Sequence, residues 1–363
     1  MTGGSRAAGF PPTVGPERVA AVDSRDMRSR IEGLPGDLVE AADRAARFAD
    51  RLEGRRAGAV AVLGMGGSAI GGDLAAAATV ERRRVPLEVV RGYDLPAWIE
   101  GDAWIVASSY SGNTEETLAA YEAAKARGLP AVAITTGGQL GERAGTHGDP
   151  VLLLPPGYPP RAALGHSFAS CAIVVAALAP GLDVRAEADA IAAAGEAMRP
   201  LPEEWLATDA VNPAFAVARE ASAALPLVYA GHPVAIAAAR RWRTQLNENA
   251  KLLAFTCEFP EQNHNEIVGF EAEPVVSPAV FYLETEWDSP RVRRRMEIVR
   301  RQLDRRTTSQ RRVEAGGGSP LEAMLRLCLL GDCASFLSSV ITGRDPTPVA
   351  SIDALKSELS GPR

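Results

Sequence analysis

The sequence predicts an α/β protein of two domains, each built around a mostly parallel β-sheet with helices on both faces. Two observations carry this prediction. Short apolar runs of strand length alternate with longer helical segments along most of the 363 residues, a pattern typical of parallel strands joined by helical crossovers. A proline-rich joint, PPGYPPRA at Pro155–Ala162, divides the alternation into two halves. We therefore expect a flexible lead at 1–25, a first domain at 26–160 and a second at 161–363.

The first half opens with a helical pattern from about Met27 to Arg55. The apolar runs that follow predict strands at Ala57–Leu63, Pro86–Val90, Ala103–Ser108, Ala131–Thr135 and Val151–Leu154. A glycine-rich loop, GMGGSAIGGD, follows the first strand and leads into a helix over LAAAATVERRR. A further helix follows the third strand and ends near Gly128.

The second half repeats the alternation less regularly. The apolar stretch from Phe168 to Leu182 is too short to span a bilayer, so we expect a buried helix there. Strands are predicted at Leu225–Ala230 and Ala279–Leu283. Helices are predicted at Ala235–Leu253, Arg291–Arg306, Pro320–Ile341 and Ser351–Leu359.

The composition indicates an ordinary soluble protein, and the net charge of −6 gives no reason to expect nucleic acid or an anionic membrane as a partner. Eight arginines at Arg291–Arg306 surround an apolar stripe with acidic residues among them, which favours a solvated helix face over a nucleic-acid surface. The four cysteines form no CxxC pair, so reduced thiols in the cytoplasm are expected. The N-terminal MTGGSRAAGFPPTVGPE lacks the apolar core of a signal peptide, which favours the flexible lead.

The glycine loop at Gly64–Ala69 is the first stretch with chemical content, because it lies between an expected strand and helix. As GxGxxG/A, it fits a dinucleotide-binding turn, with Ala69 in the third position and Glu88 as the acidic residue further on. A tight turn without any ligand is the alternative.

A second loop, SSYSGNTEET, follows a neighbouring strand and carries five hydroxyl residues, Ser108, Ser109, Ser111, Thr114 and Thr117. A helix N-terminus favours an anion, and hydroxyls donate hydrogen bonds to phosphate oxygens. Helix capping alone would need only one hydroxyl. Two such loops at the carboxyl ends of neighbouring parallel strands meet in one crevice. Together they favour a phosphorylated small molecule over a dinucleotide.

Glu115 and Glu116 follow the hydroxyls, where two carboxylates would repel a phosphate. Both fall in the first turn of the expected helix, where negative charge suits the helix dipole. Asn113 and Glu116 fit an N-x-x-E capping arrangement. We therefore predict that both carboxylates point away from the phosphate.

The two loops resemble the signature loops of sugar isomerase (SIS) domains, which bind phosphosugars. Four further stretches narrow the resemblance to the bifunctional phosphoglucose/phosphomannose isomerase family, whose members consist of two SIS domains: PRAALGHSF, RWRTQLNENAK, FPEQNHNEI and DPTPVASIDALKSEL. The resemblance extends from about Met27 to Leu359. It implies two flavodoxin-like three-layer sandwiches, with the phosphate loops in the first and C-terminal helices in the second.

The resemblance also implies roles for individual residues. The phosphate-binding residues correspond to Gly67, Ser68, Ser109, Ser111 and Thr114. The catalytic base corresponds to Glu248 in NENAK, and the histidine that assists ring opening corresponds to His264 in NHNE. Arg161 would steady the enediolate, and Lys356 would join the ring-opening step. Each residue alone is more often structural or solvated; their joint presence, in order, favours the catalytic roles.

The implied reaction interconverts glucose 6-phosphate and/or mannose 6-phosphate with fructose 6-phosphate through a cis-enediolate. No cofactor is expected, and no metal, because the four histidines show no metal-ligand spacing and Cys328 and Cys333 stand five apart on an apolar helix. In the family the protein is a homodimer, and the histidine corresponding to His264 crosses the interface. No nucleic acid or membrane partner is expected.

Three alternatives remain beside this interpretation. A non-catalytic phosphosugar-binding SIS-domain protein would need only the loops, and an NAD(P)-dependent enzyme would use the glycine loop. Loss of one of the two substrates cannot be separated from dual activity by sequence. The sequence also leaves open whether His166 lines the site or only packs, and what the tract at 304–318 does.

Overall fold

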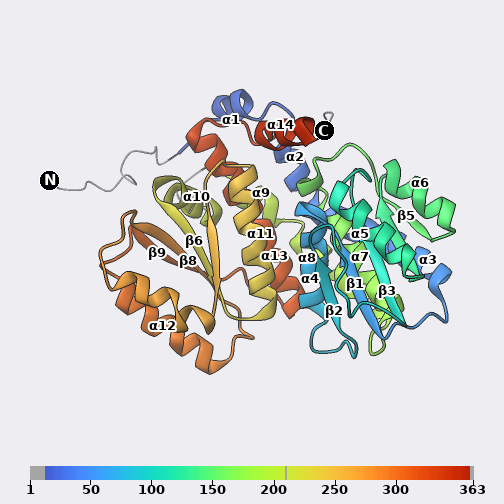
Figure 1. The fold of residues 1–363 in the computed structure, drawn as a ribbon. Coiled ribbons are helices and arrows are strands. Elements are labelled where there is room, and N and C mark those ends of the chain that lie inside the picture. Colours follow the sequence, from blue (N-terminus) through green and yellow to red (C-terminus); the bar gives the residue numbers. More distant parts are fainter. Residues whose placement is uncertain (1–12, 209–210, 360–363) are drawn as a thin grey trace.

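The computed structural model describes residues 13–208 and 211–359, which form two parallel β-sheets lying side by side (Figure 1). The strand orders are β2-β1-β3-β4-β5 and β7-β6-β8-β9, and every strand pair is parallel. The first order is the flavodoxin-like order, and the second repeats it without a fifth strand. The strands are β1 (Ala59–Leu63), β2 (Leu87–Val90), β3 (Ala103–Ser108), β4 (Ala131–Thr135), β5 (Val151–Leu153), β6 (Leu225–Ala230), β7 (Phe255–Glu258), β8 (Pro278–Leu283) and β9 (Ser309–Val313). The predicted α/β class is confirmed.

Helices cover both faces of the first sheet because its buried strands alternate their side chains between two apolar clusters. Val60 and Val62 of β1 belong to the cluster with α3, α4, α7 and α8, whereas Ala61 and Leu63 belong to the cluster with α5 and α6. These helices are α3 (Leu34–Ala49), α4 (Gly66–Thr79), α5 (Glu115–Ala126), α6 (Gly138–His147), α7 (Leu164–Leu178) and α8 (Val184–Met198).

The second sheet is covered on one face by α12, whose Met296, Val299 and Leu303 pack against Tyr229 and Tyr282. This arginine-rich helix is therefore amphipathic, with its apolar stripe on the sheet. The helices of this half are α9 (Leu201–Trp205), α10 (Pro213–Ala223), α11 (Pro233–Glu248), α12 (Pro290–Leu303), α13 (Pro320–Thr342) and α14 (Ala350–Leu359). Helices α10 and α11 lie on β6 and β8, and both pack on α13.

One apolar cluster extends through both halves. It contains Val62 of the first sheet, Phe281 of the second, and side chains of α4 and α11, which contact each other between the sheets (Figure 1). Within the described residues, α13 is the one helix long and apolar enough to cross a membrane, yet 94% of its most apolar window is buried inside the fold. It is the central helix of this shared core.

The glycine-rich segment after β1 is helical, which corrects the expected loop. Helix α4 begins at Gly66, so only Gly64 and Met65 of GMGGSAIGGD lie outside it. A Cβ on Gly72 would lie 2.9 Å from Cγ1 of Val62, and one on Gly71 would lie 3.2 Å from the Ser167 carbonyl carbon of α7. These glycines allow α4 to pack closely on β1 and α7. A glycine-rich sequence alone does not distinguish such packing from a turn.

Several boundaries also differ from expectation. The helix expected at 27–55 is divided at Gly33 into α2 (Met27–Glu32) and α3, followed by a 3-10 turn at Asp50–Leu52. Helix α11 ends at Glu248, five residues before its expected end. Strands β7 and β9 are not predicted, because each lies at the edge of its sheet and lacks a continuous buried run.

Part of the segment predicted as a flexible lead at 1–25 is helical, because Pro16–Val22 forms helix α1. Arg18 of this helix donates hydrogen bonds to the carbonyls of Val340 and Ile341 at 2.8 and 2.7 Å. Residues 1–12 lie outside the described residues. The division near residue 160 stays a prediction; α7 and α8, which follow it, pack on α3 and α4 of the first half.

Candidate active site

The glycine loop and the hydroxyl loop meet at the carboxyl ends of β1 and β3, which are neighbours in the first sheet. A Cβ on Gly64 would lie 3.0 Å from the Ser108 carbonyl oxygen, and the Tyr110 amide donates to Oγ of Ser68 at 3.2 Å. The strand order reverses direction between β1 and β3, which is where ligands bind in open α/β sheets. The predicted meeting of the loops is therefore observed.

The predicted phosphate-binding hydroxyls lie at or beside the place where the two loops meet. Ser68 and Ser109 are buried, Thr114 is half-buried and Ser111 is exposed. The hydroxyls of Ser109 and Thr114 are 2.9 Å apart, and Oγ of Ser111 accepts from the Asn113 amide at 3.2 Å. A hydroxyl that accepts a hydrogen bond keeps its own proton to donate. Ser68 and Ser111 can thus still donate to an anion.

The predicted N-x-x-E cap is not formed. Thr114 occupies the N-cap position of α5 without a side-chain cap, and Glu115 and Glu116 begin the helix. Oδ1 of Asn113 instead accepts from the Gln139 amide at 3.1 Å, which joins the hydroxyl loop to the start of α6. This partner lies on a neighbouring element, beyond the reach of a local pattern. The outward direction of the two carboxylates stays a prediction.

Gly67, in the first turn of α4, brings the start of this helix against the residue expected to act on the enediolate. A Cβ at Gly67 would lie 2.9 Å from the Pro160 carbonyl oxygen and 3.1 Å from Cα of Arg161. The two backbones therefore touch at a point where no side chain fits. The small residues of the first loop are thus in direct contact with the segment that carries Arg161.

Gly67→Ala should separate these two backbones by a few tenths of an ångström. We expect it to cost about 1–3 kcal/mol of stability, as overpacking does, and to weaken phosphosugar binding measured by calorimetry. Gly145→Ala is the matched control, because a Cβ there meets nothing within 4 Å and alanine favours a helix. Equal behaviour of the two variants would contradict the close approach.

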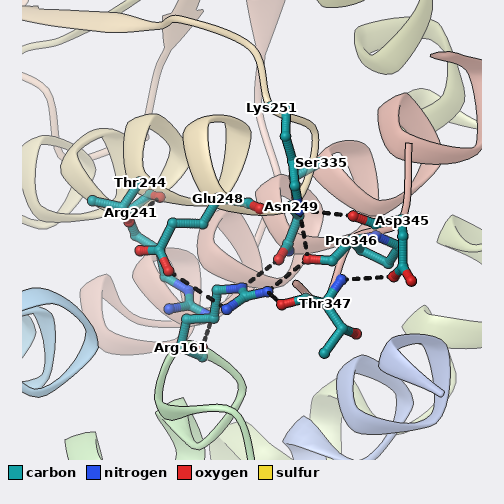
Figure 2. Close-up of polar contacts among 10 residues, drawn as sticks. All are labelled: Arg161, Arg241, Thr244, Glu248, Asn249, Lys251, Ser335, Asp345, Pro346 and Thr347. Carbon is teal, nitrogen blue, oxygen red and sulfur yellow. Dashed lines mark hydrogen bonds and ion pairs between the residues drawn. The ribbon is translucent and has the colours of Figure 1, made fainter. Parts of the chain in front are cut away.

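Arg161 is buried, with only 5% of its surface exposed, and lies at the centre of a set of fixed acceptors. Its Nε donates to Oδ1 of Asn249 at 2.6 Å, and its Nη2 donates to the carbonyls of Pro346 and Thr347 at 2.6 and 2.9 Å (Figure 2). Because these bonds hold the guanidinium plane, Nη1 is presented to Glu248, 3.5 Å from its carboxylate. Burial lowers the pKa of Arg161, and Glu248 opposes this shift.

Glu248 is the last residue of α11, and its side chain is 25% exposed. A carboxylate at a helix C-terminus opposes the helix dipole, at a cost of about 0.3–1 kcal/mol. Arg161 supplies the compensating positive charge. A partly exposed carboxylate paired with an oriented arginine can accept a proton from a bound molecule while the arginine stabilises the negative charge that develops.

Asp332 and Ser335 of α13 support the Arg161–Glu248 pair through Arg241 and Asn249. Arg241, 2% exposed, donates to both carboxylate oxygens of Asp332 at 2.9 and 2.6 Å, and to the Arg161 carbonyl at 3.0 Å. Burial raises the pKa of Asp332, and Arg241 opposes that shift. Nδ2 of Asn249 donates to Oγ of Ser335 at 3.0 Å. Arg161 is therefore anchored to α11 and α13 at the same time.

His264 and Lys356 are not brought to this pair within the described chain. His264 ends a 3-10 turn at Glu261–His264 and is exposed. Lys356 lies on α14, every residue of which is exposed. Neither forms a hydrogen bond or ion pair with the other predicted site residues among the described residues.

His166 packs between helices, which answers the question left open by the sequence. It is 1% exposed, with Nδ1 3.1 Å from Nη2 of Arg44 and Nε2 3.4 Å from Oδ1 of Asp37. Its ring meets that of Tyr158 edge-on, with centroids 5.2 Å apart. These contacts join α7 to α3.

The contacts of Asn249, Lys251 and Asp345–Thr347 are absent from the sequence prediction. The first two follow Glu248 within NENAK, and the third lies within the stretch DPTP, so the quoted stretches already contain them. What the sequence does not show is that Pro346 and Thr347 contribute main-chain carbonyls, which carry no residue-specific signal.

The chain resembles known proteins in both sequence and fold. Residues 210–359 match the family described as the bacterial phospho-glucose isomerase C-terminal SIS domain. Among solved structures, the tagatose-6-phosphate ketose/aldose isomerase of Escherichia coli superposes with a TM-score of 0.65, covering 88% of this chain and 93% of that chain. At 17% identity, this likeness concerns the fold alone.

Two curated relatives align along most of the chain. The bifunctional phosphoglucose/phosphomannose isomerase of Caldicellulosiruptor bescii is 34% identical over 339 residues, which cover 92% of this chain and 99% of the relative. The protein of the same name from Aquifex aeolicus is 32% identical and covers 83% and 90%, respectively. Identity at this level over nearly the whole of both proteins confirms the predicted resemblance: the chain belongs to the family of bifunctional phosphoglucose/phosphomannose isomerases.

Proposed function

We propose that the protein is an aldose–ketose isomerase that interconverts glucose 6-phosphate, mannose 6-phosphate or both with fructose 6-phosphate, without a metal. The observation that carries this proposal is the pairing of Glu248 with a buried, oriented Arg161 whose backbone touches the phosphate loop at Gly67. The names of the curated relatives support the substrate class.

The phosphate binds at Gly67, Ser68, Ser109, Ser111 and Thr114. Short uncharged donors at the start of α4 and α5 suit a dianion, and the helix dipoles add to the attraction. The phosphate lies away from the reacting carbons, so its binding energy orients them toward Glu248.

Glu248 takes the proton from C2 of the opened sugar, and the electron pair of that bond forms the C1–C2 double bond of a cis-enediolate. Negative charge develops on the carbonyl oxygen, where Nη1 of Arg161 stabilises it. The proton of the C2 hydroxyl passes to the C1 oxygen of the enediolate, and Glu248 returns the carbon-bound proton to C1, so that C2 becomes the carbonyl carbon of fructose 6-phosphate. Glucose and mannose 6-phosphate differ only at C2, which is planar in the enediolate, so one base can serve both.

Ring opening needs His264 and Lys356, both exposed in the described chain. We place His264 across the interface of a homodimer, where a second copy brings it to the site, and Lys356 on α14 as the residue that joins it. The four cysteines are free thiols, which supports a cytoplasmic location. The proposed substrates would place the enzyme in glycolysis and gluconeogenesis.

The test supplies fructose 6-phosphate to purified protein with a metal chelator present and quantifies glucose 6-phosphate and mannose 6-phosphate in parallel. We expect turnover to both products, undiminished by the chelator, because no group of three or more potential ligands among the described residues has the geometry of a metal site. Turnover lost with the chelator and restored by a divalent cation would refute the metal-free mechanism.

A non-catalytic phosphosugar sensor is the remaining candidate. It is favoured by the loops alone, which need neither Glu248 nor Arg161 for binding. Phosphosugar binding by calorimetry together with absent turnover would establish it. Heat on titration with NADP would instead revive the dinucleotide interpretation of the glycine loop.

A further inference from the structure

Lys251 adopts a backbone conformation that lysine rarely takes. Its φ of 53° lies in the left-handed region, and among the described residues only Asp26 shares a positive φ without being glycine. A side chain with a Cβ is strained there, so such a residue persists only where its surroundings hold it. Contacts around Lys251, which follows Glu248 by three residues, must therefore stabilise this conformation.

The side chain of Lys251 stabilises the conformation, because its ammonium donates to three main-chain carbonyls. Nζ lies 2.8 Å from the oxygen of Glu248, 2.7 Å from that of Asp345 and 3.1 Å from that of Pro346 (Figure 2). An ammonium has three donors, and all three are used. The end of α11 and the segment before α14 are thus joined through one atom.

The Pro346 carbonyl is shared between Lys251 and Arg161. It accepts from Nζ of Lys251 at 3.1 Å and from Nη2 of Arg161 at 2.6 Å. The neighbouring Thr347 carbonyl also accepts from Arg161, at 2.9 Å. Displacement of the Asp345–Thr347 segment would therefore remove two of the acceptors that orient the Arg161 guanidinium.

Lysine is rare in this chain. Of 39 basic residues, only Lys125, Lys251 and Lys356 are lysine, and all the others are arginine. Where a positive charge is enough, this chain therefore uses arginine. A compact ammonium suits three carbonyls that converge on one point, whereas the planar fork of arginine does not.

We propose that Lys251 is a positioning residue for the isomerase reaction: it fixes the Asp345–Thr347 segment against α11 and, through the Pro346 carbonyl, keeps Arg161 aligned with Glu248. This proposal rests on the proposed function. Lys251 need not touch substrate, since it acts through Arg161.

Because the role of Lys251 depends on its charge, kcat should depend on pH. Partial burial of the ammonium lowers the pKa of Lys251 to about 8, Arg161 adds to this shift, and Asp345 and Glu248 oppose it. Arg344, whose Nη1 donates to the Lys251 carbonyl at 2.8 Å, is the other charged side chain packed here. Below pH 8 the ammonium holds three acceptors; above it, one proton and the charge are lost. We expect kcat of the wild type to fall as pH rises through about 8.

The experiment compares Lys251→Met with Lys251→Gly. Both remove the ammonium, but glycine also relieves the positive φ and should be the more stable of the two. We expect kcat to fall about 10- to 100-fold equally in both, as small misplacements of reacting groups do. KM should stay within about threefold of wild type, because the phosphate loops lie elsewhere. The fall of kcat near pH 8 should disappear in both variants.

Lys125→Met is the matched control. Lys125 also donates to a main-chain carbonyl, that of Leu129 at 3.1 Å, and pairs with Asp149 at 2.8 Å, but at the far end of α5 from the hydroxyl loop. It should lower thermal stability and leave kcat unchanged. Greater activity in Lys251→Gly than in Lys251→Met, following their stabilities, would overturn the positioning role, as would a pH profile unchanged from wild type.

Amide hydrogen exchange of residues 343–349 separates this proposal from the proposed function, because it does not require turnover. Faster exchange of this segment in both Lys251 variants, with Lys125→Met unchanged, supports the clamp; equal exchange in all forms overturns it. A wild-type protein without isomerase activity would refute the proposed function and, with it, the catalytic part of this inference, while exchange would still decide whether Lys251 holds the segment.

Discussion

The Glu248→Gln variant is expected to bind phosphosugars about as well as the wild type and to turn them over on the order of 10²–10⁴-fold more slowly. The amide keeps the size of the side chain and an oxygen that can face Arg161, but it cannot accept the C2 proton. Affinity should survive, because the proposed phosphate-binding residues lie in the two loops and do not include Glu248. The loss should therefore appear in kcat.

Steady-state kinetics with fructose 6-phosphate and calorimetry with 5-phosphoarabinonate, which resembles the enediolate, measure the two quantities. Glu220→Gln is the matched control, because Glu220 is 21% exposed and pairs with Arg311 much as Glu248 does with Arg161. It should retain wild-type kcat. A Glu248→Gln variant within about tenfold of the wild type would remove Glu248 from the role of base.

The Arg241→Met variant is expected to lose about 3–5 kcal/mol of unfolding free energy, because it leaves the carboxylate of Asp332 buried without its cation. Arg241 and Asp332 are 2% and 4% exposed, so water cannot replace the lost partner. The double variant Arg241→Met/Asp332→Leu should recover most of this loss, since two apolar side chains tolerate the buried site.

Urea denaturation of the two variants and of Asp332→Leu gives the coupling free energy of the pair. Arg294→Met is the control, since Arg294 and Glu297 form an exposed pair, 57% and 55% accessible, worth about 0–1 kcal/mol. A single Arg241→Met variant that loses less than the control would show that the pair does not hold the helices together. The double variant should still show reduced kcat, because Arg241 also donates to the Arg161 carbonyl.

The centres of both sheets are predictable because their strands are buried on both faces. The runs at Ala103–Ser108, Ala131–Thr135 and Leu225–Ala230 agree with the observed β3, β4 and β6 at both ends. Edge strands carry a weaker signal: β9 reads SQRRV, with a single buried residue, and polar side chains of that kind also occur in loops. Whether a strand can be predicted from sequence therefore depends on how continuously its residues are buried, and not on strand propensity alone.

The candidate site is predictable in its residue types and unpredictable in its contacts. The hydroxyl loop can be read locally, since its function depends on neighbouring residues. The setting of Arg161 cannot, because its guanidinium bonds to a carbonyl 185 positions away in the chain. A lone arginine after proline looks solvated in sequence, yet folding buries it between two helices and a distant segment.

The single apolar core through both sheets has a consequence for how substrate enters and leaves. Halves that share a continuous core have no soft joint, so they cannot open and close about each other as two lobes do around a hinge. Motion around a substrate is then expected in single surface elements and not between the two halves. Helix α14 is such an element: its residues are all exposed, and its connection to the core runs through the Asp345–Thr347 segment. Any opening of the proposed site is therefore expected to involve this ten-residue helix and its short connection, and not a movement of one sheet against the other.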